Sequence, residues 1–128
     1  MSTTLVAAAR NAACDAIVDL VDGGAGSNGT IEWVRSDEST SVCSTDLSAT
    51  AFGSAAAGVA TLAGGSLDSD GATAGTIAYA QFKDKAGTKI WTDSVGTSGE
   101  NINLSSVTLA NNDVVRLTSY TFTVSATS

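Results

Sequence analysis

The chain contains no histidine and no proline, and only two of its 128 residues are cysteines. Without histidine, no side chain has an unperturbed pKa near neutrality, so acid–base catalysis would depend on carboxylates or lysines with strongly shifted pKa values. A serine nucleophile would also lack its usual base, and the sequence holds neither a G-x-S-x-G nor a Ser-x-x-Lys motif. These absences favour a binding or structural protein over an enzyme, with no catalytic residue and no cofactor.

Charge is also scarce, because charged side chains make up 15% of the chain and acids outnumber bases by 13 to 6. A net charge of −7 argues against a nucleic-acid ligand, since phosphate binding needs a basic surface. No stretch approaches the roughly 18 apolar residues of a membrane span. The start, MSTTLVAAARNAACDAIVDL, lacks the features of a secretory signal. We therefore expect cytoplasmic synthesis and no membrane partner.

The two cysteines, Cys14 and Cys43, have no C-x-x-C spacing and no histidine to complete a zinc site. We expect no metal site here and interpret them as two buried free thiols, with a disulfide as the alternative.

The N-terminal part predicts a helix from about Thr4 to Asp22. Ser2 or Thr3 could cap its start, and Gly23 begins the glycine-rich linker, residues 23–29, that ends it. Apolar residues recur at helical spacing and would form its buried stripe: Leu5, Ala9, Ala12, Ala16, Ile17 and Leu20.

Two acidic residues, Asp19 and Asp22, fall in the last turn of this helix, where they oppose the helix dipole. We therefore expect a basic group beside them, supplied by Arg35, by Arg116 or by another subunit. The linker itself matches G-x-G-x-x-G, but a helix precedes it and a strand follows, the reverse of a dinucleotide site, so we interpret it as flexible.

From residue 30 onward the apolar residues alternate with period two, which is typical of strands. Asp84–Gly87 predicts a hairpin turn between two of them. The composition and spacing predict one domain, residues 1–128: a mainly β, antiparallel β-sandwich or jelly-roll-like fold over about residues 30–125, with one N-terminal α-helix covering an edge or face. The expected strands cover residues 30–35, 42–47, 59–63, 76–84, 88–93, 102–104 and 114–124.

Ser66–Gly71 places oxygens as the first half of a calcium-binding EF-hand loop does. Its twelfth position is Ile77 instead of glutamate, so we interpret the segment as a polar loop, with a weak metal site as the alternative.

Four segments, RNAACDAIVDLVDGGAG, SATAFGSAAAGVATLAG, DSVGTSGENINL and VVRLTSYTFTVSA, resemble small virion proteins of tailed bacteriophages. The resemblance covers most of the chain and implies a head decoration, or cement, protein. Such a protein would be made in the host cytoplasm, lie on the outer capsid surface of the virion and bind the major capsid protein of the expanded head. We expect a homo-oligomer, with a trimer as the working choice.

Contact with the shell is expected through exposed loops, and the candidate residues are Asp37, Glu38, Ser39, Thr40, Asp68, Asp70, Thr97 and Glu100. Two alternatives stay open. A carbohydrate-binding or adhesive module of a virion surface or tail fibre would show Trp33, Trp91, Tyr79 or Tyr120 exposed beside Asp or Asn. A tail-tube or head–tail connector subunit would form closed rings.

Overall fold

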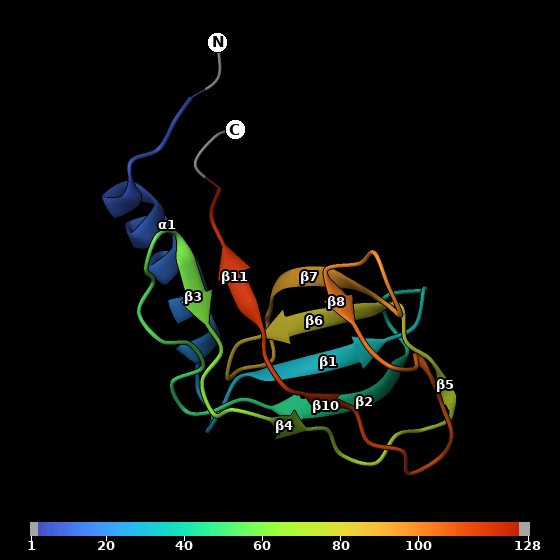
Figure 1. Ribbon diagram of the computed structural model, residues 1–128. Coiled ribbons are helices and arrows are strands. Elements are labelled where there is room, and N and C mark those ends of the chain that lie inside the picture. Colours follow the sequence, from blue (N-terminus) through green and yellow to red (C-terminus); the bar gives the residue numbers. More distant parts are fainter. Residues whose placement is uncertain (1–2, 126–128) are drawn as a thin grey trace.

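The computed structural model describes residues 3–125, which form a mainly β protein with one N-terminal helix (Figure 1). Helix α1 spans Ala7–Asp19 and continues as one 3₁₀ turn, η1 (Leu20–Asp22). The strands that follow are short: β1 (Thr30–Val34), β2 (Ser41–Asp46), β3 (Val59–Thr61), β4 (Leu67–Asp68), β5 (Gly75–Thr76), β6 (Tyr79–Lys83), β7 (Lys89–Gly96), β8 (Ile102–Asn103), β9 (Thr108–Leu109), β10 (Arg116–Leu117) and β11 (Thr121–Thr123).

The body of the protein is a five-stranded sheet in the order β2-β1-β6-β7-β8. Strand β1 lies inside it, and alternation along β1 buries Ile31 and Trp33 completely. The Trp33 indole N–H donates to Thr45 Oγ1 at 2.9 Å, so the one polar atom of this ring is paired in the interior. The expected antiparallel pairing holds except for β8, a two-residue strand that runs parallel to β7 after the loop between them turns back.

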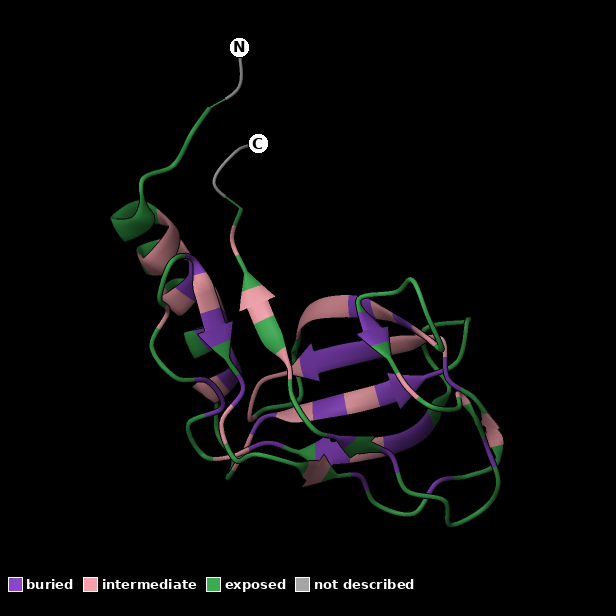
Figure 2. Ribbon diagram, in the orientation of Figure 1, coloured by how far each residue is buried: buried purple, intermediate pink, exposed green. Residues whose placement is uncertain are grey.

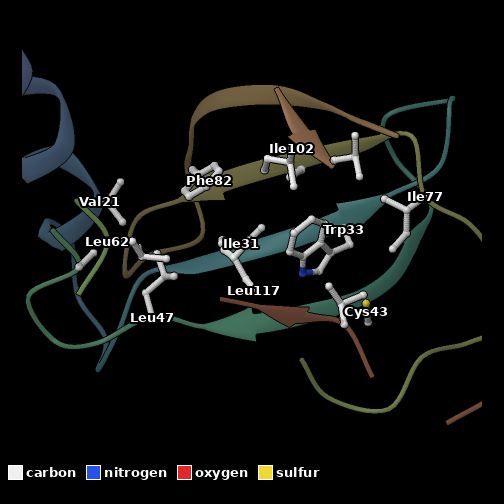
Figure 3. Close-up of a cluster of buried hydrophobic side chains, with 14 of the residues drawn as sticks. Val21, Ile31, Trp33, Cys43, Leu47, Leu62, Ile77, Phe82, Ile102 and Leu117 are labelled. Atoms are coloured by element: carbon white, nitrogen blue, oxygen red, sulfur yellow. The ribbon is translucent and has the colours of Figure 1, made fainter. Parts of the chain in front are cut away.

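A second layer folds over this sheet. Strand β4 lies beside β2, because the Asp70 amide donates to Ser44 O and the Thr73 amide donates to Val42 O. Strand β10 pairs with β4 and brings Leu117 over the buried face of the sheet (Figures 1 and 3). The apolar core lies between these layers, and the sandwich-like arrangement agrees with the fold class that the sequence predicts. A two-stranded pair of β5 and β9 lies beyond one end.

Helix α1 packs against β3 and β11, the strands drawn beside it in Figure 1, and together they form a lobe at one end of the sheet. Three polar side chains of the helical segment hold the backbone of residues 51–58. Asn11, Asp15 and Asp22 each accept a hydrogen bond, from the amides of Gly58, Ala55 and Ala51, at 2.8–2.9 Å. The helix is therefore attached by carboxylates and an amide as well as by apolar contact.

The expected buried stripe of the helix is wrong. The residues that the helical segment buries are Cys14, Val18 and Val21, whereas Leu20 is 54% exposed. Figure 2 shows that much of the helix is coloured as exposed or intermediate. The helix turns its polar side toward the lobe because residues 51–58 offer amide groups that its carboxylates satisfy. The helix also begins at Ala7, later than expected, and its N-cap is Val6 without a side-chain cap; Ser2 lies outside the described residues.

The prediction that Arg35 or Arg116 lies beside Asp19 and Asp22 is also wrong. Asp22 accepts the Ala51 amide, and Asp19 lies exposed on the outer side of the helix. Arg35 instead donates to Ala74 O, and Arg116 pairs with Asp68.

The glycine-rich linker is packed, where flexibility was expected. Gly29 is buried, and a Cβ there would lie 2.6 Å from Val21 Cγ1 and 2.8 Å from Lys83 O. The Lys85 amide donates to Gly23 O, which holds the linker against the β6–β7 hairpin. Only glycine permits this close approach of two backbones.

The last expected strand, residues 114–124, is divided. Its first part forms β10, paired with β4, and its second part forms β11, paired with β3 in the helix lobe. The expected strand over residues 76–84 is likewise divided into β5 and β6. Strand β4 falls in a segment interpreted as a loop, and β9 falls where no strand was expected. The expected hairpin at Asp84–Gly87 is confirmed, with Gly87 at φ 88°.

Both cysteines are buried free thiols, so the disulfide alternative is wrong for this structure. Burial raises the pKa of the Cys43 thiol, and Cys14 donates its S–H to Phe122 O at 3.4 Å.

Candidate functional site

Two exposed loops lie at the same end of the five-stranded sheet. The register places Val34 opposite Tyr79 and Tyr79 opposite Ser94, so the chain leaves β1 and β7 at one end (Figure 1). The loop of residues 35–40 follows β1, and the loop of residues 97–101 follows β7. We call these two segments the end loops. They bring together six of the expected contact residues, all exposed: Asp37, Glu38, Ser39, Thr40, Thr97 and Glu100.

The first end loop is braced by one carboxylate. Asp37 accepts hydrogen bonds from the amides of Ser39, at 3.0 Å, and Thr40, at 2.9 Å, and from the Thr40 hydroxyl at 2.5 Å. These donors favour the charged form and lower the pKa of Asp37 to about 2. Glu38 adopts φ 60°, and its carbonyl accepts the amide group of Gln81 at 2.8 Å. The loop is therefore held in one shape, and the Glu38 carboxylate takes no part in these hydrogen bonds.

The second end loop is braced through Asn103. Its side chain accepts the Glu100 amide and donates to Glu100 O, both at 3.1 Å. Gly96 makes room for this turn, because a Cβ at that position would lie 2.7 Å from Glu100 Cγ. The carboxylates of Glu38 and Glu100 accept no hydrogen bond from the residues that the structure describes, so both are free to meet a partner.

Acidification is expected to release the first end loop. The folded pKa of Asp37 lies below its unfolded value of 3.8, so its hydrogen bonds contribute stability above that value and are lost as the pH falls through about 2. In an NMR titration, the amide signals of Ser39 and Thr40 should move together with a midpoint near pH 2. An Asp37→Ala variant should show the released positions at every pH. A midpoint near 3.8 would contradict the brace.

Asp68 and Asp70 lie elsewhere, beside the middle of β2. Asp68 forms a two-point ion pair with Arg116, at 2.8 and 3.1 Å, which lowers the pKa of its carboxyl group. Asp70 accepts the Ser44 amide at 2.9 Å. Both carboxylates bind β4 to its neighbours, so the structure does not join them to the end loops and gives them a bracing role. In the segment Ser66–Gly71, which resembles half of a calcium-binding loop, these two carboxylates are therefore used for contacts within the chain.

A partly buried polar network, which the sequence patterns do not single out, links β7 to the C-terminal segment. The Tyr120 hydroxyl donates to Asp93, and it accepts the Trp91 indole N–H at 3.1 Å. Asn101 donates to the other oxygen of Asp93 at 3.1 Å. Burial, with Asp93 beside it, raises the pKa of Tyr120. Asp93 is buried on β7, where alternation places it on the same face as Trp91 and Val95.

This network bears on a carbohydrate site, because Tyr120 is half-buried beside Asp93 and Asn101 in a hollow of about 270 Å³. Its ring, however, packs against Phe82 at 4.7 Å and Phe52 at 6.0 Å between ring centroids. Its hydroxyl is occupied by Asp93 and Trp91. The aromatic stacking surface that a sugar needs is therefore directed into the core.

No group of three or more His, Cys, Asp or Glu side chains suited to a metal ion occurs within residues 3–125. In the same range, no helix has the length and apolar character needed to cross a membrane. The chain matches no protein-family model, and no curated protein or solved structure shows significant similarity to it.

Proposed function

We propose that this protein is a non-enzymatic capsid decoration protein of a tailed bacteriophage, bound to the outer surface of the expanded head through its end loops. The supporting observation is the pair of braced, exposed loops that bring Glu38 and Glu100 to one end of a rigid sheet. Loops that are already ordered lose little conformational entropy on binding, so more of their contact energy becomes affinity.

The partner is the major capsid protein, which would present basic or amide groups to the two carboxylates. A protein that binds the expanded shell and no other state stabilises that state by RT ln(1 + [L]/Kd) per site. Such a role requires a stable scaffold and a fixed contact surface, and it requires no chemistry. It also agrees with the resemblance to virion proteins and with the low charged fraction of the chain, 15%.

Reversing the charge of the end loops is expected to weaken attachment to the shell. A Glu38→Lys/Glu100→Lys variant keeps the hydrogen bonds of Asp37 and Asn103 that hold the end loops. Its two lysines would repel the basic groups proposed on the capsid protein. Its dissociation constant for expanded capsids that lack the native protein should rise more than about tenfold, or ~1.4 kcal/mol, in a co-sedimentation assay.

The matched control is Asp19→Lys/Asp46→Lys, which makes the same change of charge at exposed positions. Asp19 lies on α1, and Asp46 pairs with Thr30 at the opposite end of the sheet. This control should bind as the native protein does. Equal loss in both variants would show that net charge, and not the end loops, governs attachment.

A further inference from the structure

The curled sheet has two end strands that do not pair with each other. Following the hydrogen bonds, the order runs β10, β4, β2, β1, β6, β7, β8. Within the described part of the chain, β10 pairs with β4 alone and β8 pairs with β7 alone. Each of these two strands therefore keeps one edge without a strand partner.

The open edges face the same groove. The Ser69 amide donates to Val115 O, so the alternation of the ladder turns the main-chain groups of Arg116 and Thr118 away from β4. The Leu104 amide donates to Gly96 O, so the main-chain groups of Asn103 point away from β7.

Asn103, Arg116 and Thr118 line the same two adjoining hollows, of about 430 and 290 Å³. The 270 Å³ hollow beside Tyr120 continues them. We call this groove, between β8 and the 113–121 segment, the β8–β10 slot. It presents the main-chain groups of two strand edges, which is the arrangement that binds an extended peptide by strand addition.

The slot favours an uncharged, partly apolar segment. The Arg116 guanidinium is paired with Asp68, and the Asp113 carboxylate accepts the Ala110 amide at 2.8 Å. Val114, at the rim of the slot, is 52% exposed, and Leu104 is half-buried there. An occupant should therefore pair through its backbone and cover these apolar side chains.

The chain carries a segment with these properties at the far side of the molecule. Residues 3–6, Thr-Thr-Leu-Val, are uncharged and rich in residues that favour strands. Thr4 takes part in an isolated β-bridge within its own chain, and Val6 has an extended backbone, with φ −68° and ψ 159°, so the segment already has strand conformation. Val6 is 71% exposed and Leu5 is 36% exposed, which leaves apolar side chains open to a partner. The segment lies beyond the outer end of α1, away from β8 and β10, so it is positioned to meet the slot of another molecule (Figure 1).

We propose that residues 3–6 of one copy occupy the β8–β10 slot of a second copy as an added strand. Val114 of the second copy then covers the exposed Leu5 or Val6 of the first. Because the segment and the slot are different surfaces, the contact is heterologous and joins copies head to tail. This association is separate from attachment to the capsid and takes place in solution.

The test is the oligomeric state of the purified chain, measured by light scattering after size exclusion over a range of concentrations. The full chain should have a mass that is a fixed multiple of the monomer mass. Deletion of residues 2–6 and, independently, Val114→Asp should each give monomers with an unchanged far-UV spectrum. Leu20→Asp, which places the same charge at an exposed apolar position outside both surfaces, should leave the oligomer intact.

A synthetic peptide with the sequence of residues 2–8 provides a second readout. Added to the deletion variant, it should shift the amide signals of Asn103 and Thr118, whereas a scrambled peptide should not. A full chain that stays monomeric at millimolar concentration would overturn the proposal. So would an oligomer that survives the deletion, or one that Leu20→Asp dissociates. Because none of these measurements involves capsids, failure here would leave the proposed attachment to the shell to its own test.

Discussion

Replacement of Trp33 by alanine is expected to lower the free energy of unfolding by about 3–5 kcal/mol. Trp33 is fully buried on β1, between Cys43 of β2 and Ala80 of β6, and it is among the largest side chains of the core (Figure 3). Its removal leaves a cavity that surrounding strands cannot close, and it also leaves Thr45 Oγ1 without its donor in the interior. Chemical denaturation monitored by far-UV circular dichroism measures this loss.

The control for this experiment is Leu20→Ala. Leu20 is also a large apolar side chain, but it is 54% exposed, so its truncation should change the stability by no more than about 0.5 kcal/mol. A loss below about 1 kcal/mol for Trp33→Ala would contradict the core described here.

Removal of the two carboxylates that hold residues 51–58 is expected to lower the free energy of unfolding by about 3–6 kcal/mol in the double variant Asp15→Ala/Asp22→Ala. Each carboxylate accepts a main-chain amide, of Ala55 or Ala51, and each amide loses its partner in the variant. Hydrogen bonds to charged acceptors contribute about 1.5–3 kcal/mol each, and the two bonds share no residue, which favours near-additivity. Hydrogen exchange should show new exposure of residues 51–58 before the five-stranded sheet is affected.

Asp19 supplies the matched control, because it lies on the same helical segment and is exposed. Asp19→Ala removes a negative charge near the C-terminus of α1, where it opposes the helix dipole, and should raise the stability by some tenths of a kcal/mol. If all three substitutions had equal effects, the side-chain tethers would have no special role in attaching the helix.

The sequence predicts the β class, the helix and the central hairpin because each of these rests on a local signal. Alternation over residues 30–35 places Ile31 and Trp33 on one face, and both are buried as a strand of this kind requires. Gly87 likewise marks a turn through its own backbone freedom. Such signals lie within a few residues and need no knowledge of distant contacts.

The orientation of the helix could not be predicted in the same way. The pattern of polar and apolar residues places Asp15 and Asp22 on the outer face of the helix and the alanine stripe on its buried face. In the structure both carboxylates face the lobe, because they accept hydrogen bonds from amides that are distant in the sequence. The division of residues 114–124 has a similar cause, since β10 and β11 pair with strands on different parts of the molecule. The orientation of the helix and the division of residues 114–124 therefore both depend on contacts with residues far away in the sequence.

The exposed, polar character of the end loops can be predicted from the sequence, whereas their role as a contact surface stays a prediction. Asp37–Thr40 and Glu100 were singled out as exposed polar loops, and the sheet register brings them to one end. Asp68 looked the same in the sequence, but its ion pair with Arg116 depends on the β4–β10 pairing, which no local pattern shows. Local polarity therefore identifies loops, while the register decides which of them share a surface.

The most direct test of the proposed function is saturation binding of the native protein to expanded and unexpanded capsids of the phage that encodes it, both prepared without this protein. Decoration predicts saturable binding to expanded shells at a fixed copy number per capsomer, with a raised melting temperature of the shell. Unexpanded shells should bind little. Absence of binding to either form, or equal binding without a change in shell melting temperature, would contradict the account.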